Sequence, residues 1–271
     1  YLLLHHRNGE DKMTKQSIIF FDIDGTLFDH DKKVPASAKE AVFKLKENGH
    51  VVAIATGRAP FMFADLRKEL GINSYVSYNG QYVVLEGEVI YTNPLNTSSL
   101  VNLAEKALDN GHPVVFMDHE DMKANVPEHP YIKESIATLK IDHFPGYDPF
   151  YYKNRELYQT LFFCPEGEEK QYEMEYKDFD FVRWHPVSLD IVPKGGSKAK
   201  GIKKIVEKLG IPKERQYAFG DGLNDIEMLN TIENSVAMGN AKDVVKSASK
   251  YVTESVDNDG IYHGLKMLGL L

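Results

Sequence analysis

Cysteine is almost absent from this chain of 271 residues, which contains a single one, Cys164. One cysteine excludes an intrachain disulfide, and we expect a reducing compartment, with the cytoplasm as the predicted location. No apolar run approaches the roughly 18 residues that a membrane-spanning helix needs. The run Leu2-Leu3-Leu4 is too short for the core of a signal peptide. We therefore predict no membrane partner.

Positive charge is also scarce in this chain. Its 32 lysine and arginine residues are outnumbered by 40 aspartate and glutamate residues, which gives a formal net charge of -8. Because nucleic-acid backbones are polyanions, we predict no nucleic-acid partner. The rest of the composition is ordinary, 42% hydrophobic and 27% charged, in a chain long enough for two domains.

Short, continuously apolar runs alternate with amphipathic stretches from Ser17 onward. The predicted strands are "SIIFFDID", "HVVAIATG", "YVSYNG", "QYAFGDG" and "SVAMGN". The predicted helices are "VPASAKEAVFKLKENG", "APFMFADLRKELG", "SKAKGIKKIVEKLG", "LNDIEMLNT" and "AKDVVKSA". Continuous rather than alternating apolar strands, linked by helices, indicate a parallel sheet covered on both faces. The predicted fold class is therefore α/β.

The middle of the chain, residues 82–187, has a different pattern. "QYVVLEGEVIY" predicts a hairpin, residues 97–110 a helix, and "HPVVFMD" with "MKANVP" two antiparallel strands. We interpret 82–187 as an α+β domain inserted between two parts of one α/β domain, 13–81 and 188–271. Residues 1–12, "YLLLHHRNGEDK", show no clear period, and we interpret them as an added leader or a misassigned start outside the fold.

Two aspartates follow the first apolar run, in "IIFFDIDGTLFD". Asp22 and Asp24 fall at the carboxyl end of the predicted strand, where sites form in parallel sheets. Residues two apart in an extended chain point to one side, so both carboxylates can face one cleft. Thr56 and Gly57 follow the next strand, and a hydroxyl with backbone N–H groups at a helix entrance suits a phosphate.

Four further polar residues occupy comparable places later in the chain. Lys198 begins a helix, and Asp221, Asn224 and Asp225 follow another strand in "GDGLND". Four aspartates in one cleft would repel strongly unless a divalent cation balanced them, and hard oxygen ligands suit Mg²⁺. Taken singly, each residue has an ordinary alternative as a helix cap, a turn or a solvated lysine. Their joint occurrence at strand ends and helix starts favours a site.

These motifs together resemble those of the haloacid dehalogenase (HAD) superfamily of aspartyl phosphatases. "DIDGTL" is similar to its first motif, "ATGR" to its second, Lys198 to its third and "GDGLNDIEML" to its fourth. "SYNG", "PKGGSKAKGIKKIVEKLGI" and "AMGNA" further resemble the Cof-type subgroup. One small departure is Ala199, where many members have glycine. The resemblance covers essentially the whole chain after Met13. It implies a Rossmann-like parallel-sheet core with an inserted C2-type cap that sets substrate specificity.

The resemblance also implies a role for each candidate residue. Asp22 would be the nucleophile that forms an aspartyl-phosphate, and Asp24 would be the general acid and base. The implied ligands of Mg²⁺ are the Asp22 carboxylate, the Asp24 backbone carbonyl and Asp221, with Asp225 in support. The implied phosphate-binding residues are Thr56, Gly57, Lys198 and Asn224, of which Thr56 and Lys198 also count as catalytic and Asn224 orients the set.

The expected function is Mg²⁺-dependent hydrolysis of small phosphorylated metabolites, such as sugar phosphates or phosphorylated cofactors, by a monomer or homodimer. Two alternatives stay open. In a phosphomutase, the aspartyl-phosphate would pass to a second sugar hydroxyl instead of water. A non-catalytic phosphate-ligand sensor would bind without turnover, but it would need no nucleophile paired with an acid, so the complete acidic set argues against it.

Overall fold

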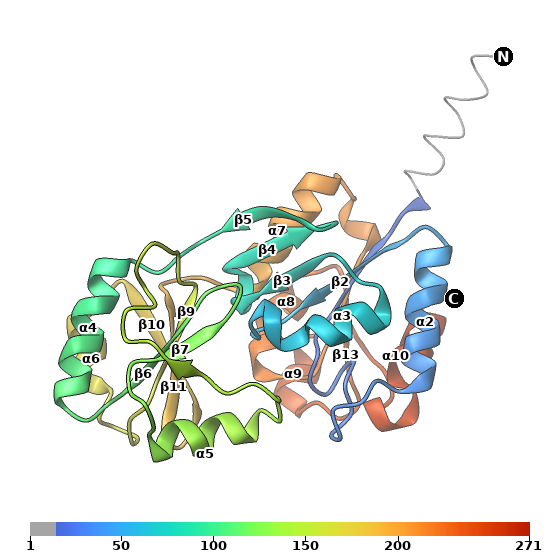
Figure 1. Cartoon of the computed structure of the whole chain (residues 1–271). Coiled ribbons are helices and arrows are strands. Elements are labelled where there is room, and N and C mark those ends of the chain that lie inside the picture. Colours follow the sequence, from blue (N-terminus) through green and yellow to red (C-terminus); the bar gives the residue numbers. More distant parts are fainter. Residues whose placement is uncertain (1–14) are drawn as a thin grey trace, which may run out of the picture. The chain divides into compact units, whose positions relative to one another are not determined.

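The computed structural model describes residues 15–271, and the predicted leader, residues 1–12, lies outside the described residues. Two sheets dominate the described part (Figure 1). The chain divides into two compact units. Of the described residues, the first contains 15–57, Asp65–Ile90 and Ser197–Leu271, and the second contains Arg58–Ala64 and Tyr91–Gly196. The predicted division, one core domain made of 13–81 and 188–271 with 82–187 inserted, stays a prediction.

The first sheet is mixed. Within residues 15–271 it has eight strands, in the order β14-β13-β12-β1-β2-β3-β4-β5. Their bounds are β1 Ile18–Phe21, β2 Val51–Ala55, β3 Tyr75–Ser77, β4 Tyr82–Leu85, β5 Glu88–Thr92, β12 Gln216–Gly220, β13 Asn234–Ala237 and β14 Tyr251–Val252. Neighbours from β14 to β3 are parallel, which confirms the predicted parallel core, whereas β3 and β4 are antiparallel. The predicted hairpin, β4 and β5, thus extends this sheet, because a tight turn joins β4 directly to β3.

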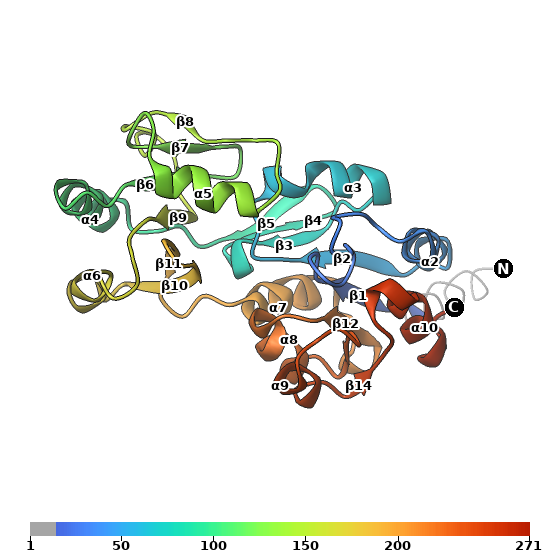
Figure 2. The same cartoon turned by 90° about the horizontal axis from the view of Figure 1, so that it is seen from below.

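Helices cover both faces of this sheet: α3 lies on one side and α7 and α8 on the other (Figure 2). The α-helices are α2 Ala36–Glu47, α3 Ala64–Leu70, α7 Lys198–Leu209, α8 Ile226–Thr231, α9 Asp243–Ser247 and α10 Gly260–Met267. Short 3₁₀ turns are η1 Pro60–Phe63, η2 Tyr78–Gly80, η3 Lys213–Arg215, η4 Leu223–Asp225 and η5 Val256–Asn258. All four residues of β1 are fully buried, as a central strand covered on both faces requires.

The ends of α7 are set by its flanking residues. The Ser197 hydroxyl accepts a hydrogen bond from the backbone N–H of Lys200 at 3.2 Å, which caps the first turn. Gly210 ends the helix in the left-handed conformation, with φ of 66°. Lys198 is therefore the first helical residue of α7. This N-terminal end of the helix lies next to the turn η2.

The second unit is built on a sheet ordered β10-β11-β9-β6-β7-β8. Its elements are α4 Thr97–Asp109, β6 Val114–Met117, β7 Met122–Ala124, α5 Pro130–Thr138, β8 Gly146–Tyr147, β9 Gln159–Phe162, α6 Lys170–Glu175, β10 Phe179–His185 and β11 Ser188–Pro193. The predicted antiparallel pair is confirmed as β6 and β7. Buried side chains of α4 and α6 share one hydrophobic core with β6, β9 and β11. Among the described residues, no helix is long and apolar enough to cross a membrane.

Candidate active site

Three neighbouring strands end at the same edge of the first sheet. Strands β12, β1 and β2 are adjacent and parallel, so the residues that follow them lie close together. Asp22 follows β1, and its backbone N–H donates to the Phe219 carbonyl of β12 at 3.0 Å. Thr56 follows β2, and its backbone N–H donates to the Val76 carbonyl of β3 at 2.8 Å. The sheet therefore fixes the backbone of both residues.

Lys198 joins two acidic side chains. Its Nζ lies 3.1 Å from Asp22 Oδ1 and 2.6 Å from Asp225 Oδ1. The exposed fractions of Lys198, Asp22 and Asp225 are 2%, 7% and 0%. Burial by itself would lower the pKa of Lys198, but the carboxylates of Asp22 and Asp225 outweigh it and raise that pKa above its ordinary value. Lys198 therefore stays charged and neutralises part of the acidic set.

Asp225 is the most deeply buried of these acids. Its Oδ2 accepts hydrogen bonds from the backbone N–H groups of Asp221 and Gly222, both at 3.0 Å. Its Oδ1 accepts from Lys198. Three charge-assisted hydrogen bonds offset the desolvation of this carboxylate. Asp225 thereby holds the turn that presents Asp221.

Asp221 is partly buried and is oriented by two side chains from outside the acidic set. Thr26 Oγ1 donates to Asp221 Oδ1 at 3.2 Å, and Asn240 Nδ2 donates to Oδ2 at 3.4 Å. Asn240 Nδ2 also donates to the Gly25 carbonyl at 3.0 Å. Gly25 has φ of 77°, and a Cβ there would lie 2.0 Å from Asp221 Oδ2. The turn after β1 requires glycine, because Asp221 fills the space beside it.

Asp22, Asp221 and Asp225 form one acidic cluster, in which one carboxylate oxygen from each lies within 4.8 Å of the others. Burial and the charge of Asp225 raise the pKa of Asp22 well above its usual range. The same two causes, burial first, raise the pKa of Asp221 to about 6. Lys198 supplies one positive charge for three carboxylates. A divalent cation that prefers oxygen ligands fits this donor set, so the cluster is a candidate metal centre.

Asp24 is not one of the three clustered acids. Its Oδ1 lies 2.6 Å from Lys32 Nζ, and the two side chains are 42% and 30% exposed. Two successive acids of one motif therefore have different surroundings: Asp22 is buried against Lys198, and Asp24 is open to solvent and paired with Lys32. The predicted metal contact of Asp24 is through its backbone carbonyl, and it stays a prediction.

The predicted phosphate-binding residues have unequal surroundings. Thr56 is 2% exposed, and Gly57 after it contacts the side chain of Asn79. Asn224 lies in η4, is exposed, and places its amide beside Gly222. The structure thus brings Thr56 and Gly57 to the sheet edge that carries Asp22, and it leaves Asn224 accessible to solvent. The roles assigned to these residues stay predictions.

Three residues of this site were given no role from the sequence: Thr26, Lys32 and Asn240. Thr26 lies inside the quoted motif "DIDGTL". Lys32 lies in "HDKK", and a lysine in a polar loop carries no signal. Asn240 lies in "AMGNA", a segment that resembles the Cof-type subgroup. The resemblance drew attention to the segment but did not indicate what Asn240 contacts. Asn240 is 19 positions from Asp221 in the sequence, and only the folded chain places them in contact.

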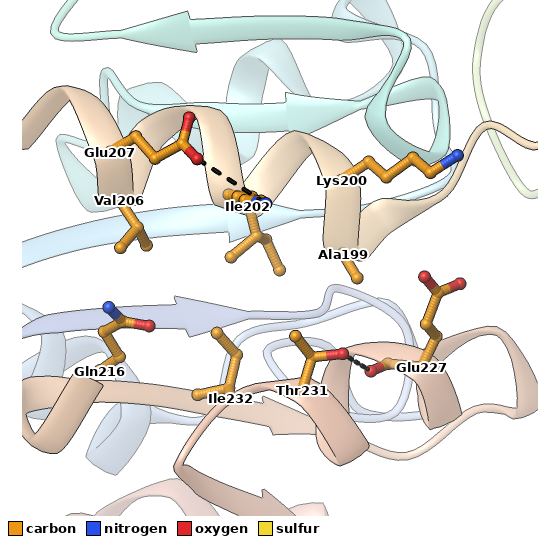
Figure 3. Close-up of a pocket in the computed structure, with 10 residues that line it drawn as sticks. Ala199, Lys200, Ile202, Val206, Glu207, Gln216, Glu227, Thr231 and Ile232 are labelled. Atoms are coloured by element: carbon orange, nitrogen blue, oxygen red, sulfur yellow. Dashed lines mark hydrogen bonds and ion pairs between the residues drawn. The ribbon is translucent and has the colours of Figure 1, made fainter.

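A separate groove of about 480 Å³ lies between α7 and α8 (Figure 3). Its walls include apolar and small side chains from the two helices and the residue after α8: Ala199, Ile202, Val206, Thr231 and Ile232. Lys203 and Glu207, which also line it, form an exposed ion pair at 3.8 Å. None of the clustered acids lines this groove.

Comparison with known proteins assigns the chain to a family. The family model for haloacid dehalogenase-like hydrolases matches residues 19–265. A Bacillus subtilis protein named "Putative phosphatase YkrA" is 49% identical over 254 residues, which cover 94% of this chain and 98% of that protein. The chain therefore belongs to the haloacid dehalogenase-like hydrolases.

Solved structures are similar over nearly the whole chain. A hypothetical protein from Geobacillus kaustophilus HTA426 is 55% identical with a TM-score of 0.92, over 94% of this chain and 100% of that one. The HAD subclass IIB sugar phosphatase BT4131 is 33% identical with a TM-score of 0.79, over the same shares. The predicted α/β core with an inserted α+β cap is confirmed. The chain is a phosphatase of this superfamily, a phosphoric monoester hydrolase.

Proposed function

We propose that this phosphatase hydrolyses small phosphorylated metabolites, such as sugar phosphates or phosphorylated cofactors, with Mg²⁺ and through an aspartyl-phosphate on Asp22. The carrying observation is the buried contact of Lys198 with Asp22, beside the acids Asp221 and Asp225. A carboxylate fixed at a strand end, next to a buried ammonium and a candidate metal centre, suits attack on an anionic phosphate. Similarity to the sugar phosphatase BT4131 supports the substrate class.

Asp22 acts in the first half of the reaction. One of its carboxylate oxygens attacks the phosphorus, the bond from phosphorus to the ester oxygen breaks, and Asp24 gives its proton to the departing oxygen. Lys198, the Thr56 hydroxyl and the backbone N–H of Gly57 bind the non-bridging phosphoryl oxygens, and Asn224 orients the set. Because Lys198 is buried, its charge acts in a low dielectric, where it stabilises the transition state more than it would in water.

Asp24 acts again in the second half. It takes a proton from a water molecule whose oxygen attacks the phosphorus. The bond from phosphorus to Asp22 breaks, inorganic phosphate leaves, and Asp22 is a carboxylate again. Mg²⁺, when bound by the Asp22 carboxylate, the Asp24 backbone carbonyl and Asp221 with Asp225 in support, would offset the negative charge of the phosphate.

The Asp22→Asn variant tests this proposal, with Asp31→Asn as a matched control because the Asp31 side chain is 69% exposed. An amide keeps the size of the side chain but is no nucleophile. We expect phosphate release by Asp22→Asn to fall below about 1% of the parent rate, and Asp31→Asn to match the parent. Activity well above that level in a folded Asp22→Asn variant would contradict the covalent role.

A substrate panel tests the proposed substrate class. Phosphate release is measured from sugar phosphates, phosphorylated cofactors, nucleotides, a phosphopeptide and p-nitrophenyl phosphate. We expect kcat/KM for at least one sugar phosphate or cofactor to exceed the value for p-nitrophenyl phosphate by roughly tenfold, because remote contacts add binding energy. Preference for the phosphopeptide over every small ester would contradict the proposal.

The proposal includes action in the cytoplasm by a monomer or a homodimer. A single, buried cysteine suits a reducing compartment. Light scattering of the purified protein measures its assembly, and we expect one or two chains of 30.7 kDa each. A larger assembly would contradict this part of the proposal.

A further inference from the structure

Three consecutive residues after β3 have their backbone in the left-handed region. The φ angles of Tyr78, Asn79 and Gly80 are 50°, 51° and 98°. Glycine adopts this region freely, but for tyrosine and asparagine it costs about 1 kcal/mol or more each. Tyr78 is also fully buried. Contacts with the surrounding structure must therefore stabilise this turn, η2, in its strained form.

On one side, Asn79 holds the turn that follows β2. Its backbone N–H donates to the Thr56 carbonyl at 3.0 Å. Its side chain lies against Gly57, where a Cβ would be 2.9 Å from Asn79 Nδ2. The backbone and the side chain of Asn79 thus both contact the Thr56–Gly57 turn. Any larger residue at Gly57 would displace the amide.

On the other side, Gly80 packs against the first turn of α7. A Cβ on Gly80 would lie 2.0 Å from the carbonyl oxygen of Ser197, the residue before Lys198. Gly201 of α7 faces it, and a Cβ on Gly201 would lie 2.7 Å from Gly80 Cα. Glycine inside a helix is less favourable than alanine by about 0.5–1 kcal/mol. Its place here is explained by the close approach of the two backbones.

We propose that the Tyr78–Gly80 turn sets the separation between the two phosphate-binding elements, the Thr56–Gly57 turn and Lys198. Asn79 and Gly80 are its positioning residues. This inference rests on the proposed function, in which both elements contact oxygens of one phosphoryl group. An error of about 1 Å in their separation can lower the reaction rate by up to roughly 10²-fold, because the transition state is bound less tightly. The backbone strain at Tyr78 and Asn79 arises because only three residues connect the contacts with the Thr56–Gly57 turn to the contacts with α7.

The test compares Gly80→Ala with Gly87→Ala. Both glycines have positive φ, 98° and 83°, but nothing lies within 4 Å of a Cβ at Gly87. The control therefore carries backbone strain without the clash against Ser197. Binding of orthovanadate, an analogue of the phosphoryl group, is measured by calorimetry in the presence of Mg²⁺, and thermal melting verifies the fold. We expect Gly80→Ala to bind orthovanadate roughly tenfold more weakly or worse, and Gly87→Ala to bind like the parent.

Asn79→Gly is the second variant and decides the test if Gly80→Ala does not fold. Glycine keeps the left-handed backbone but removes the amide that contacts Gly57. We expect orthovanadate binding to weaken while the protein still melts cooperatively. Parent-like binding by the folded variants overturns the positioning role alone. A parent protein that binds no orthovanadate overturns the proposed function, and the positioning role with it, so the two failures are distinguishable.

Discussion

Lys198 is the residue on which charge balance and proposed catalysis most depend. It is buried between Asp22 and Asp225, whereas Lys203 on the same helix is 74% exposed and pairs only loosely with Glu207. We expect Lys198→Ala to lower kcat/KM for p-nitrophenyl phosphate on the order of 10²–10³-fold, because an ammonium beside phosphate in a water-poor site stabilises the transition state strongly. Lys203→Ala should stay near the parent. Equal small effects would make Lys198 a purely structural lysine.

Asp24 is more accessible than Asp22: the Asp24 side chain is 42% exposed, and Asp22 as a whole residue is 7% exposed. The proposed exchange of protons with a leaving group and with water requires such access. An alkoxide leaves poorly without a proton, and a positioned acid typically contributes about 10²–10⁴-fold. A nitrophenolate needs little protonation. We therefore expect Asp24→Asn to slow a sugar phosphate more than p-nitrophenyl phosphate, measured where phosphoryl transfer to Asp22 limits the rate. If the ratio of variant rate to parent rate is the same for the two substrates, Asp24 does not act as the acid.

At the scale of elements, the sequence predicted what depends on local pattern. The continuous apolar run of β1 and the polar residues directly after β1, β2 and β12 were enough to place Asp22, Thr56 and Asp221 at one edge of a parallel sheet. The pairing of β4 with β3 was missed, because a hairpin pattern does not say which sheet it joins. Contacts such as Lys32 with Asp24 and Asn240 with Asp221 were also missed, since they depend on how loops meet in the folded chain.

Strand β11 carries an acid whose ionisation should affect stability. Burial raises the pKa of Asp190 to about 7, from an ordinary value of 3.8, and Gln159 Nε2 donates to its Oδ1 at 3.3 Å. The folded state therefore binds this proton more tightly than the unfolded state does. Its contribution to stability is complete below about pH 4 and is lost as the pH rises to about 7, by up to about 1.4 kcal/mol per pH unit.

The Asp190→Asn variant tests this expectation, because an amide does not titrate. Urea unfolding of the parent and the variant is followed at several pH values between about 5 and 8. In the difference between the two free energies of unfolding, the contributions of all other titratable groups cancel. We expect the free energy of unfolding of the variant to increase relative to that of the parent as the pH rises. Parallel curves would show that Asp190 has an ordinary pKa in the folded protein.

At the scale of the whole molecule, the acidic cluster exists only in the folded chain. Its members Asp22 and Asp221 are 199 positions apart in the sequence. A cation that binds this cluster therefore stabilises the native state, by about 2.7 kcal/mol at a hundredfold excess over its dissociation constant. We expect Mg²⁺ to raise the melting temperature, and a chelator to abolish activity until Mg²⁺ is restored.

Asp221→Ala, with Asp31→Ala as a surface control, separates specific from general effects of the ion. Asp221 belongs to the cluster, and the Asp31 side chain is 69% exposed. The Mg²⁺-dependent rise in melting temperature should disappear in Asp221→Ala and persist in Asp31→Ala. Full activity of the parent in the presence of a chelator would refute the metal requirement.

The stereochemical course at phosphorus tests the central claim, that Asp22 is a covalent nucleophile, most directly. Each in-line displacement inverts the configuration at phosphorus. Transfer to Asp22 followed by transfer to water makes two displacements and restores it, whereas direct attack by water makes one. The measurement uses a phosphorothioate ester made chiral at phosphorus by its sulfur and two oxygen isotopes, hydrolysed by the parent enzyme in water that carries the third oxygen isotope. The account predicts net retention, and net inversion would contradict it.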